Sequence, residues 1–259
     1  MDFKIAMITG ATGDIGKAIT QRLCTENYQP IIIARTLDKL NILKQEIEDK
    51  FNIIPIVFCC DVSKSEEVKS VLNKIQKLNY YVDLLVNCAG KSCGGNTIDI
   101  TDEEWDDVIK TNLNSIFYIT RGLLSRNMIR KDGRIINIAS TGGKQGVIYG
   151  VPYSASKHGV VGFSKSLGLE LARARTGITV NAICPGFVES EIAKKVRKIY
   201  SKIWNIDVNE VKKRVEGRIP IGRYIEPFEV ANMVAYIASP EASGITSQAI
   251  NICGGLGNY

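Results

Sequence analysis

The chain has 259 residues, of which 45% are hydrophobic and 23% charged, and its net charge is +6. This composition is typical of an ordinary folded protein and excludes the disordered and fibrous classes. The length allows one large α/β domain or two small ones, and the charge is too small to indicate nucleic-acid binding by itself.

Short β-rich runs alternate with amphipathic segments along the whole chain. The predicted strands are, in order, KIAMIT, PIIIA, IIPIVF, VDLLVN, RIINIA, ITVNAI and SQAINI. Helices are predicted between them from about Ile15, over Leu37 to Ile47, over Val68 to Ile75, from about Glu103 to Arg130, from about Pro152 to Arg173, and in a charged insertion at about 190–218. Strands joined by helical crossovers require a parallel sheet with helices on both faces. We therefore predict one doubly wound α/β domain spanning residues 1–259.

The cysteines and the start of the chain bear on compartment and metal content. The first residues, MDFKIAMITG, lack a signal-peptide pattern, and no run reaches about 18 apolar residues, so we expect a cytoplasmic protein. Seven cysteines without a CxxC pair, and a single histidine, fit neither a disulfide framework nor a zinc site. We expect reduced thiols and no metal.

A glycine-rich turn, TGATGDIG, follows the first predicted strand and opens the first helix. Gly10, Gly13 and Gly16 leave room for backbone N–H groups and the helix N-terminus to approach a pyrophosphate. The alternative is a tight turn without a ligand. Because the turn comes directly after a buried N-terminal strand, dinucleotide binding in a Rossmann fold is the favoured interpretation.

The end of the second strand indicates which dinucleotide binds. NAD enzymes usually place a carboxylate there to accept from the adenosine ribose, whereas this chain has Arg35. A guanidinium suits a 2′-phosphate by charge and by bidentate geometry, so we predict NADPH over NADH. Asp38, slightly later, is predicted to be a helix N-cap.

Further cofactor contacts are predicted at the ends of the next strands. Asp61 is placed to accept from the adenine amino group, and Asn87, Ala89 and Gly90 of NCAG end the fourth strand, although any strand-ending turn favours Asn and Gly. Their neighbours in the same turns complete the predicted set, which adds Thr12, Asp14, Ile15, Thr36 and Val62.

The candidate catalytic residues come from IASTGG and YSASK, which supply Ser140, Tyr153 and Lys157. Tyr153 and Lys157 are four residues apart on a predicted helix and so lie on one face. Such a pair alone occurs by chance. Joined to a serine at the end of the preceding strand and to the glycine turn, it becomes specific, because ligands bind at the carboxyl ends of parallel strands.

These residue types suit the reduction of a ketone. Hydride delivery develops an alkoxide, which must be stabilised and protonated. Ser140 is predicted to bind the substrate oxygen and Tyr153 to donate the proton, while Lys157 lowers the pKa of Tyr153 and holds the nicotinamide ribose. Asn112 is predicted to hold a water that relays protons, or else to be satisfied by backbone groups. His158 is expected to be structural.

The predicted insertion is strongly basic. Between Glu191 and Arg218 there are nine Lys or Arg residues and four Asp or Glu residues. The excess is either a solvated helix face or a docking surface for an acidic partner.

The combination of the glycine motif, NCAG, Asn112, Ser140, the YxxxK pair and the PG of CPGFVES resembles the short-chain dehydrogenase/reductase family over the full length. The resemblance implies a homotetramer and a nicotinamide end lined by Pro185, Gly186, Val188 and Ser190.

A narrower resemblance, to the ketoreductases of bacterial aromatic (type II) polyketide synthases, comes from IASTGGKQGV, TGITVNA, PIGRY and the terminal CGGLGNY. It implies reduction of one ketone, at C9, of a poly-β-ketone on an acyl carrier protein. It also implies substrate contacts from Thr141, Gln145 and Val147, and a gate around Tyr200. The basic insertion then fits an acidic carrier protein.

The chain departs from the family pattern at three places. Asp14 replaces the second glycine of TGxxxGxG, Cys88 replaces the second Asn of NNAG, and Ser92, Cys93 and Gly94 replace a PGG triplet associated with product stereochemistry. An acidic side chain beside a pyrophosphate is unfavourable unless it points away or caps a helix. Two alternatives stay open, a 3-oxoacyl carrier-protein reductase of fatty acid synthesis and a regulator that senses NADP without catalysis.

Overall fold

Seven strands form one sheet in the computed structural model, which describes residues 3–257. All six strand pairings are parallel, in the spatial order β3-β2-β1-β4-β5-β6-β7. The order reverses direction at β1 and β4, where a ligand crevice is expected at the carboxyl ends of the strands. The strands are β1 (Lys4–Thr9), β2 (Tyr28–Ala34), β3 (Ile56–Cys59), β4 (Val82–Asn87), β5 (Ile129–Ile138), β6 (Thr179–Pro185) and β7 (Ala249–Ile252).

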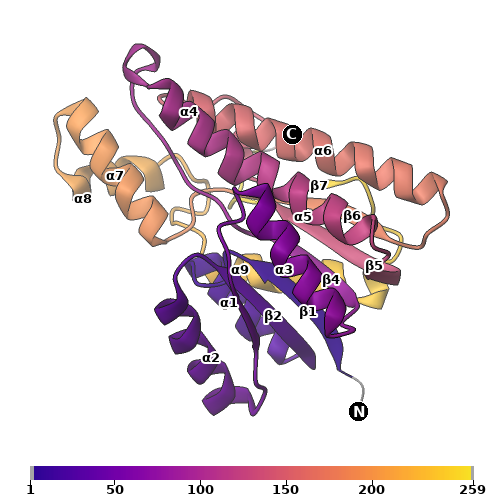
Figure 1. The fold of residues 1–259 in the computed structure, drawn as a ribbon. Helices are drawn as coiled ribbons and strands as arrows, with labels where there is room; N and C mark the ends of the chain where they lie inside the picture. Colours follow the sequence, from indigo (N-terminus) through magenta and orange to yellow (C-terminus); the bar gives the residue numbers. More distant parts are fainter. Residues whose placement is uncertain (1–2, 258–259) are drawn as a thin grey trace.

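The helices cover both faces of this sheet (Figure 1). They are α1 (Asp14–Cys24), α2 (Leu37–Phe51), α3 (Ser65–Lys77), α4 (Asp102–Ile109), α5 (Ser115–Leu124), α6 (Val151–Arg173), α7 (Glu191–Trp204), α8 (Val208–Glu216) and α9 (Pro227–Ala238). One apolar core joins the sheet to α1, α2 and α9, and a second joins it to α3, α5 and α6. The predicted fold class, a doubly wound parallel sheet in a single Rossmann domain, is confirmed.

The central strands are continuous apolar runs because both of their faces are buried. In β1, Met7 and Ile8 are fully buried on opposite faces, and each belongs to a different core. In β2, Ile31 and Ile32 likewise belong to different cores on opposite faces of the sheet. This two-sided burial makes the sheet a rigid platform for the loops at its carboxyl edge.

The prediction of one helix from about Glu103 to Arg130 is wrong about where the helix ends. A π-helical turn at Lys110–Asn114 interrupts it, and α5 ends at Leu124. Asn127 then adopts a left-handed backbone conformation, and Ile129 already pairs with Val82 in the sheet. Parallel pairing with β4 therefore takes residues that the helical spacing had assigned to the helix.

The predicted cap of α2 is also wrong. Thr36 is the N-cap residue and Leu37 begins the helix, so Asp38 lies within the first turn. A carboxylate there still interacts favourably with the positive end of the helix dipole.

The charged segment after β6 folds into α7 and α8, which stand clear of the two helical layers (Figure 1). They have a small core of their own that includes Tyr200, Val211, Val215 and Tyr224. We call this pair of helices the lid. The last two residues of the CGGLGNY run, Asn258 and Tyr259, lie outside the described residues. Over residues 3–257, none of the helices combines the length and the apolar character that crossing a membrane requires.

Candidate active site

A cavity of about 700 Å³ follows the carboxyl ends of the central strands and continues under the lid. It is lined by every residue predicted for the site except Asn87 and Asn112. One end of the cavity is formed by the glycine turn after β1, and the other by lid residues such as Tyr200. The cofactor half and the substrate half are therefore parts of one continuous space.

The glycine turn fits a dinucleotide pyrophosphate. Gly10 has a φ of +64°, and a Cβ atom there would lie 2.7 Å from the Cα of Ala89. A Cβ atom on Gly16 would lie 2.2 Å from the Gly10 carbonyl oxygen. The N-cap residue of α1, Gly13, offers no side-chain cap to the first turn of its helix. The amides at the start of α1 thus suit an anionic ligand.

The adenosine end of the cavity is positively charged. Arg35 is exposed and lies directly after β2, and Lys39, in the first turn of α2, lines the same cavity. Lys39 was not predicted, because Arg35 precedes α2 and Lys39 lies in its first turn, so helical spacing does not relate the two side chains. Two cations suit a 2′-phosphate.

Asp61 lies beside these cations, and its carboxylate accepts from the backbone N–H of Ser63 at 3.1 Å and from its hydroxyl at 2.7 Å. Partial burial raises the pKa of Asp61, but these bonds and the charges of Arg35 and Lys64 outweigh it and lower the pKa overall. Asp61 is therefore an ionised acceptor at the adenosine end of the cavity.

The Asn87 side chain turns away from the cavity, contrary to expectation. Its Nδ2 donates to Asn137 Oδ1 at 2.8 Å and to Thr120 Oγ1 at 3.2 Å, and the residue is 2% exposed. Asn87 and Asn137 are paired residues of β4 and β5, so this hydrogen bond ties the two strands together. The motif identified a buried polar position but not the direction of its side chain.

Asn112 lies in the π-helical turn and is fully buried. Its Oδ1 accepts from the backbone N–H of Lys91 at 2.8 Å, and its Nδ2 donates to the Lys91 carbonyl and to Ser156 Oγ, both at 3.0 Å. The amide thus holds the loop after β4 against α6. A water relay through Asn112 stays a prediction, whereas a positioning contact is present.

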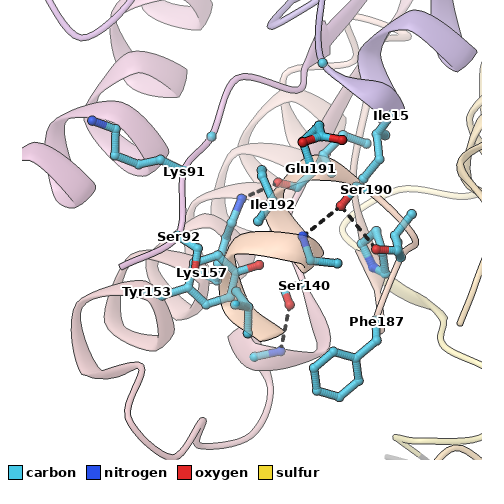
Figure 2. Close-up of a pocket in the computed structure, with 18 of the residues that line it drawn as sticks. Ile15, Lys91, Ser92, Ser140, Tyr153, Lys157, Phe187, Ser190, Glu191 and Ile192 are labelled. Carbon is cyan, nitrogen blue, oxygen red and sulfur yellow. Dashed lines mark hydrogen bonds between the residues drawn. The ribbon is translucent and has the colours of Figure 1, made fainter. Parts of the chain in front are cut away.

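The Ser140 and Tyr153 side chains line the cavity and lie beside each other (Figure 2). Ser140 follows β5, and its hydroxyl accepts from the backbone N–H of Gly142 at 3.0 Å. It also faces Tyr153 and lowers the pKa of that phenol. Gly142 permits this approach, because a Cβ atom there would lie 3.3 Å from Tyr153 Cε1 and 2.7 Å from Val147 Cγ2.

Lys157 is positioned one helical turn after Tyr153 on α6. Its ammonium donates to the Ile138 carbonyl at the end of β5 at 2.8 Å, and it lies 5.8 Å from the centre of the Tyr153 ring. The residue is 5% exposed, and burial lowers the pKa of Lys157 from 10.5 to about 8. An ammonium has three N–H donors, so the Ile138 carbonyl leaves capacity for a ligand.

The pKa of Tyr153 lies above its usual value, so the predicted lowering by Lys157 does not prevail. Burial raises this pKa, and Ser140 only partly offsets it. Tyr153 is therefore held in its protonated form, as a proton donor must be.

The lid contributes an aromatic wall to the substrate half. Tyr200 is stacked on Trp204 with ring centres 4.8 Å apart, and Tyr149 meets Tyr200 edge to face at 6.4 Å. All three line the cavity. Trp204 and Tyr149 were not predicted, although the spacing of Tyr200 and Trp204 on one helix would have indicated a shared face.

His158, the histidine expected to be structural, does not line the cavity, and its Nδ1 is hydrogen-bonded to the Ser154 carbonyl.

This fold and this arrangement of serine, tyrosine and lysine beside a glycine turn define a class of enzyme. The family described as short chain dehydrogenase matches residues 4–201, and the chain belongs to it. A protein of Streptomyces coelicolor named as a ketoacyl reductase is 48% identical over 100% of this chain and 98% of its own length.

Two further relatives are named after polyketide pathways. The granaticin polyketide synthase ketoacyl reductase 1 of Streptomyces violaceoruber is 49% identical over 98% of this chain and 93% of that protein. A crystal structure of a variant of actinorhodin polyketide ketoreductase with NADPH is 47% identical, with a TM-score of 0.93 over 100% of this chain and 98% of that chain.

Proposed function

We propose that the chain is an NADPH-dependent ketoreductase that reduces one ketone, at C9, of a poly-β-ketone held on an acyl carrier protein. The observation that carries the proposal is the placement of Ser140, Tyr153 and Lys157 in one cavity that runs from the glycine turn to the aromatic wall of the lid. The names of the relatives that match over almost the full length support the same assignment.

NADPH, when bound, would supply a hydride to the carbonyl carbon of the substrate. The carbonyl oxygen gains negative charge in that step, and the Ser140 and Tyr153 hydroxyls would both donate to it. Tyr153 then gives its proton to the oxygen, which completes the alcohol. The Lys157 ammonium, 5.8 Å from the Tyr153 ring centre, stabilises the phenolate that remains.

Arg35 and Lys39 support the choice of NADPH. Both line the adenosine end of the cavity, where NAD enzymes need a carboxylate acceptor and these cations would instead pair with a 2′-phosphate. Gly10, Gly13 and the start of α1 would hold the pyrophosphate. Pro185, Gly186 and Val188, which follow β6, would line the nicotinamide end.

The basic lid fits an acidic carrier protein. Exposed lysines on α7 and α8 outnumber the exposed acids there, so the surface of the lid is positively charged. A homotetramer belongs to the same proposal, on the resemblance to the family.

The substrate assignment is tested by comparing kcat/KM for a bicyclic ketone, trans-1-decalone, with that for an acetoacetyl thioester. We expect the bicyclic ketone to be preferred by about tenfold or more, because the aromatic wall of the lid favours a fused ring over a short acyl chain. A strong preference for the thioester would instead assign the chain to fatty acid synthesis. If NADPH is oxidised with neither ketone, the result would favour a regulator that senses NADP without catalysis.

The pH dependence of reduction follows from the lowered pKa of Lys157. Its charged form predominates below about pH 8 and is lost as the pH rises further. Because the ammonium stabilises the phenolate of Tyr153, we expect kcat/KM for reduction to fall above this pH, approaching about tenfold for each further unit. Initial rates at saturating NADPH between pH 6 and 10 measure this. A rate that stays constant to pH 10 would contradict a requirement for the charge.

A further inference from the structure

Asp14 occupies the position in the glycine turn where the family pattern has a glycine. It is the first residue of α1, and one of its carboxylate oxygens, Oδ2, accepts from the backbone N–H of Glu191 at 2.8 Å. Glu191 is the first residue of α7, and 177 positions separate the two residues in sequence. The carboxylate therefore caps the lid helix rather than its own helix.

The start of α7 has two side-chain caps. Ser190 Oγ accepts from the backbone N–H of Ala193 at 3.2 Å, and Asp14 satisfies the N–H of Glu191 (Figure 2 labels Ser190 and Glu191). The first N–H groups of a helix have no partner within the helix, and an anion there also interacts favourably with the helix dipole. Glu191, then Glu189 and Asp14, raise the pKa of Lys194 in the same turn.

The two elements that Asp14 joins form different walls of the cavity. Gly13, Asp14 and Ile15 line the cofactor half, whereas α7 contributes Ile192, Val196 and Tyr200 to the substrate half. The rest of α7 is fixed through its own contacts, such as the bidentate pair of Arg197 with Glu189 at 2.9 and 2.7 Å. The Asp14 contact fixes the N-terminal end of α7 to the cofactor turn.

We propose that Asp14 is a positioning residue that fastens the lid helix α7 to the cofactor turn and so sets the shape of the substrate half of the cavity. This proposal rests on the proposed function for the identity of the substrate, but the contact itself does not. Its direct consequence is that the first turn of α7 is ordered by Asp14 even before a substrate binds.

Hydrogen exchange of residues 188–197 in the cofactor-free protein tests the contact without any substrate. In Asp14→Ala we expect these amides to exchange about threefold to tenfold faster, as loss of one hydrogen bond to a carboxylate predicts. In Asp14→Asn the amide oxygen still accepts, so we expect exchange close to that of the wild type. Asp38→Ala is the matched control, because Asp38 is also exposed in the first turn of a helix but does not line the cavity.

Kinetics provide the second readout. In Asp14→Ala we expect KM for the ketone to rise more than kcat falls, while the Kd of NADPH weakens by less than about threefold, since no loop amide is lost. Unchanged exchange in Asp14→Ala would overturn the proposal. Equal acceleration in Asp14→Ala and Asp14→Asn would overturn the hydrogen bond as its basis. Because exchange is measured without ketone, failure of the polyketide assignment leaves this result intact.

Discussion

Replacement of Tyr153 by phenylalanine is expected to lower kcat for ketone reduction by a factor of about 10² to 10⁴. The change removes the hydroxyl that faces Ser140 and leaves the ring beside Gly142 in place. The Ser140 hydroxyl keeps the N–H of Gly142 as a donor, so the site retains its shape. Single-turnover reduction at saturating NADPH measures the loss, and equilibrium titration measures the Kd of NADPH.

The matched control is Tyr236→Phe, because Tyr236 is half exposed on α9 and does not line the cavity. We expect this variant to keep the wild-type rate. The Kd of NADPH should stay within about threefold of the wild-type value in Tyr153→Phe, since only one donor is lost. A near-normal rate in Tyr153→Phe would exclude Tyr153 as the proton donor.

Replacement of Arg35 by aspartate is expected to reverse the cofactor preference. The guanidinium that would pair with the 2′-phosphate is lost, and a carboxylate that can accept from the ribose hydroxyls of NADH is gained. Loss of a charged hydrogen bond predicts a weakening of NADPH binding by about 10 to 100-fold. The ratio of kcat/KM with NADPH to kcat/KM with NADH measures the cofactor preference.

Lys131→Asp makes the same change of charge at an exposed residue near the start of β5, at the opposite edge of the sheet from the cavity. It should leave the ratio of the two cofactors unchanged. A ratio that is also unchanged in Arg35→Asp would mean that Lys39 or another cation selects the cofactor.

The fold could be predicted because seven apolar runs alternate with helical spacing, and both signals are local. The errors arose where a distant partner decides the structure. Ile129 joins the sheet because Val82 lies opposite it, and a helical pattern cannot show this pairing. The π-helical turn that contains Asn112 also has no local signal, since its residues fit an ordinary helix.

The residues that carry the chemistry of the candidate site could be predicted, but the directions of several side chains could not. Ser140, Tyr153 and Lys157 follow from residue type and spacing, and the structure brings them together. The direction of the Asn87 side chain depends on Asn137 in the neighbouring strand. The cap that Asp14 provides depends on a residue 177 positions away. Such contacts are set by the tertiary fold.

The buried ammonium of Lys157 has a consequence for folding. Its pKa of about 8 in the folded protein lies below the ordinary value of 10.5, so the unfolded chain binds more protons between these two pH values. The free energy of unfolding therefore rises as the pH rises through this interval, by roughly 3 kcal/mol for a shift of this size. Below the interval Lys157 is charged in the folded protein, and burial of that charge destabilises the fold by the full amount. The fold is weakened in the pH range where Lys157 carries the charge that the reaction needs.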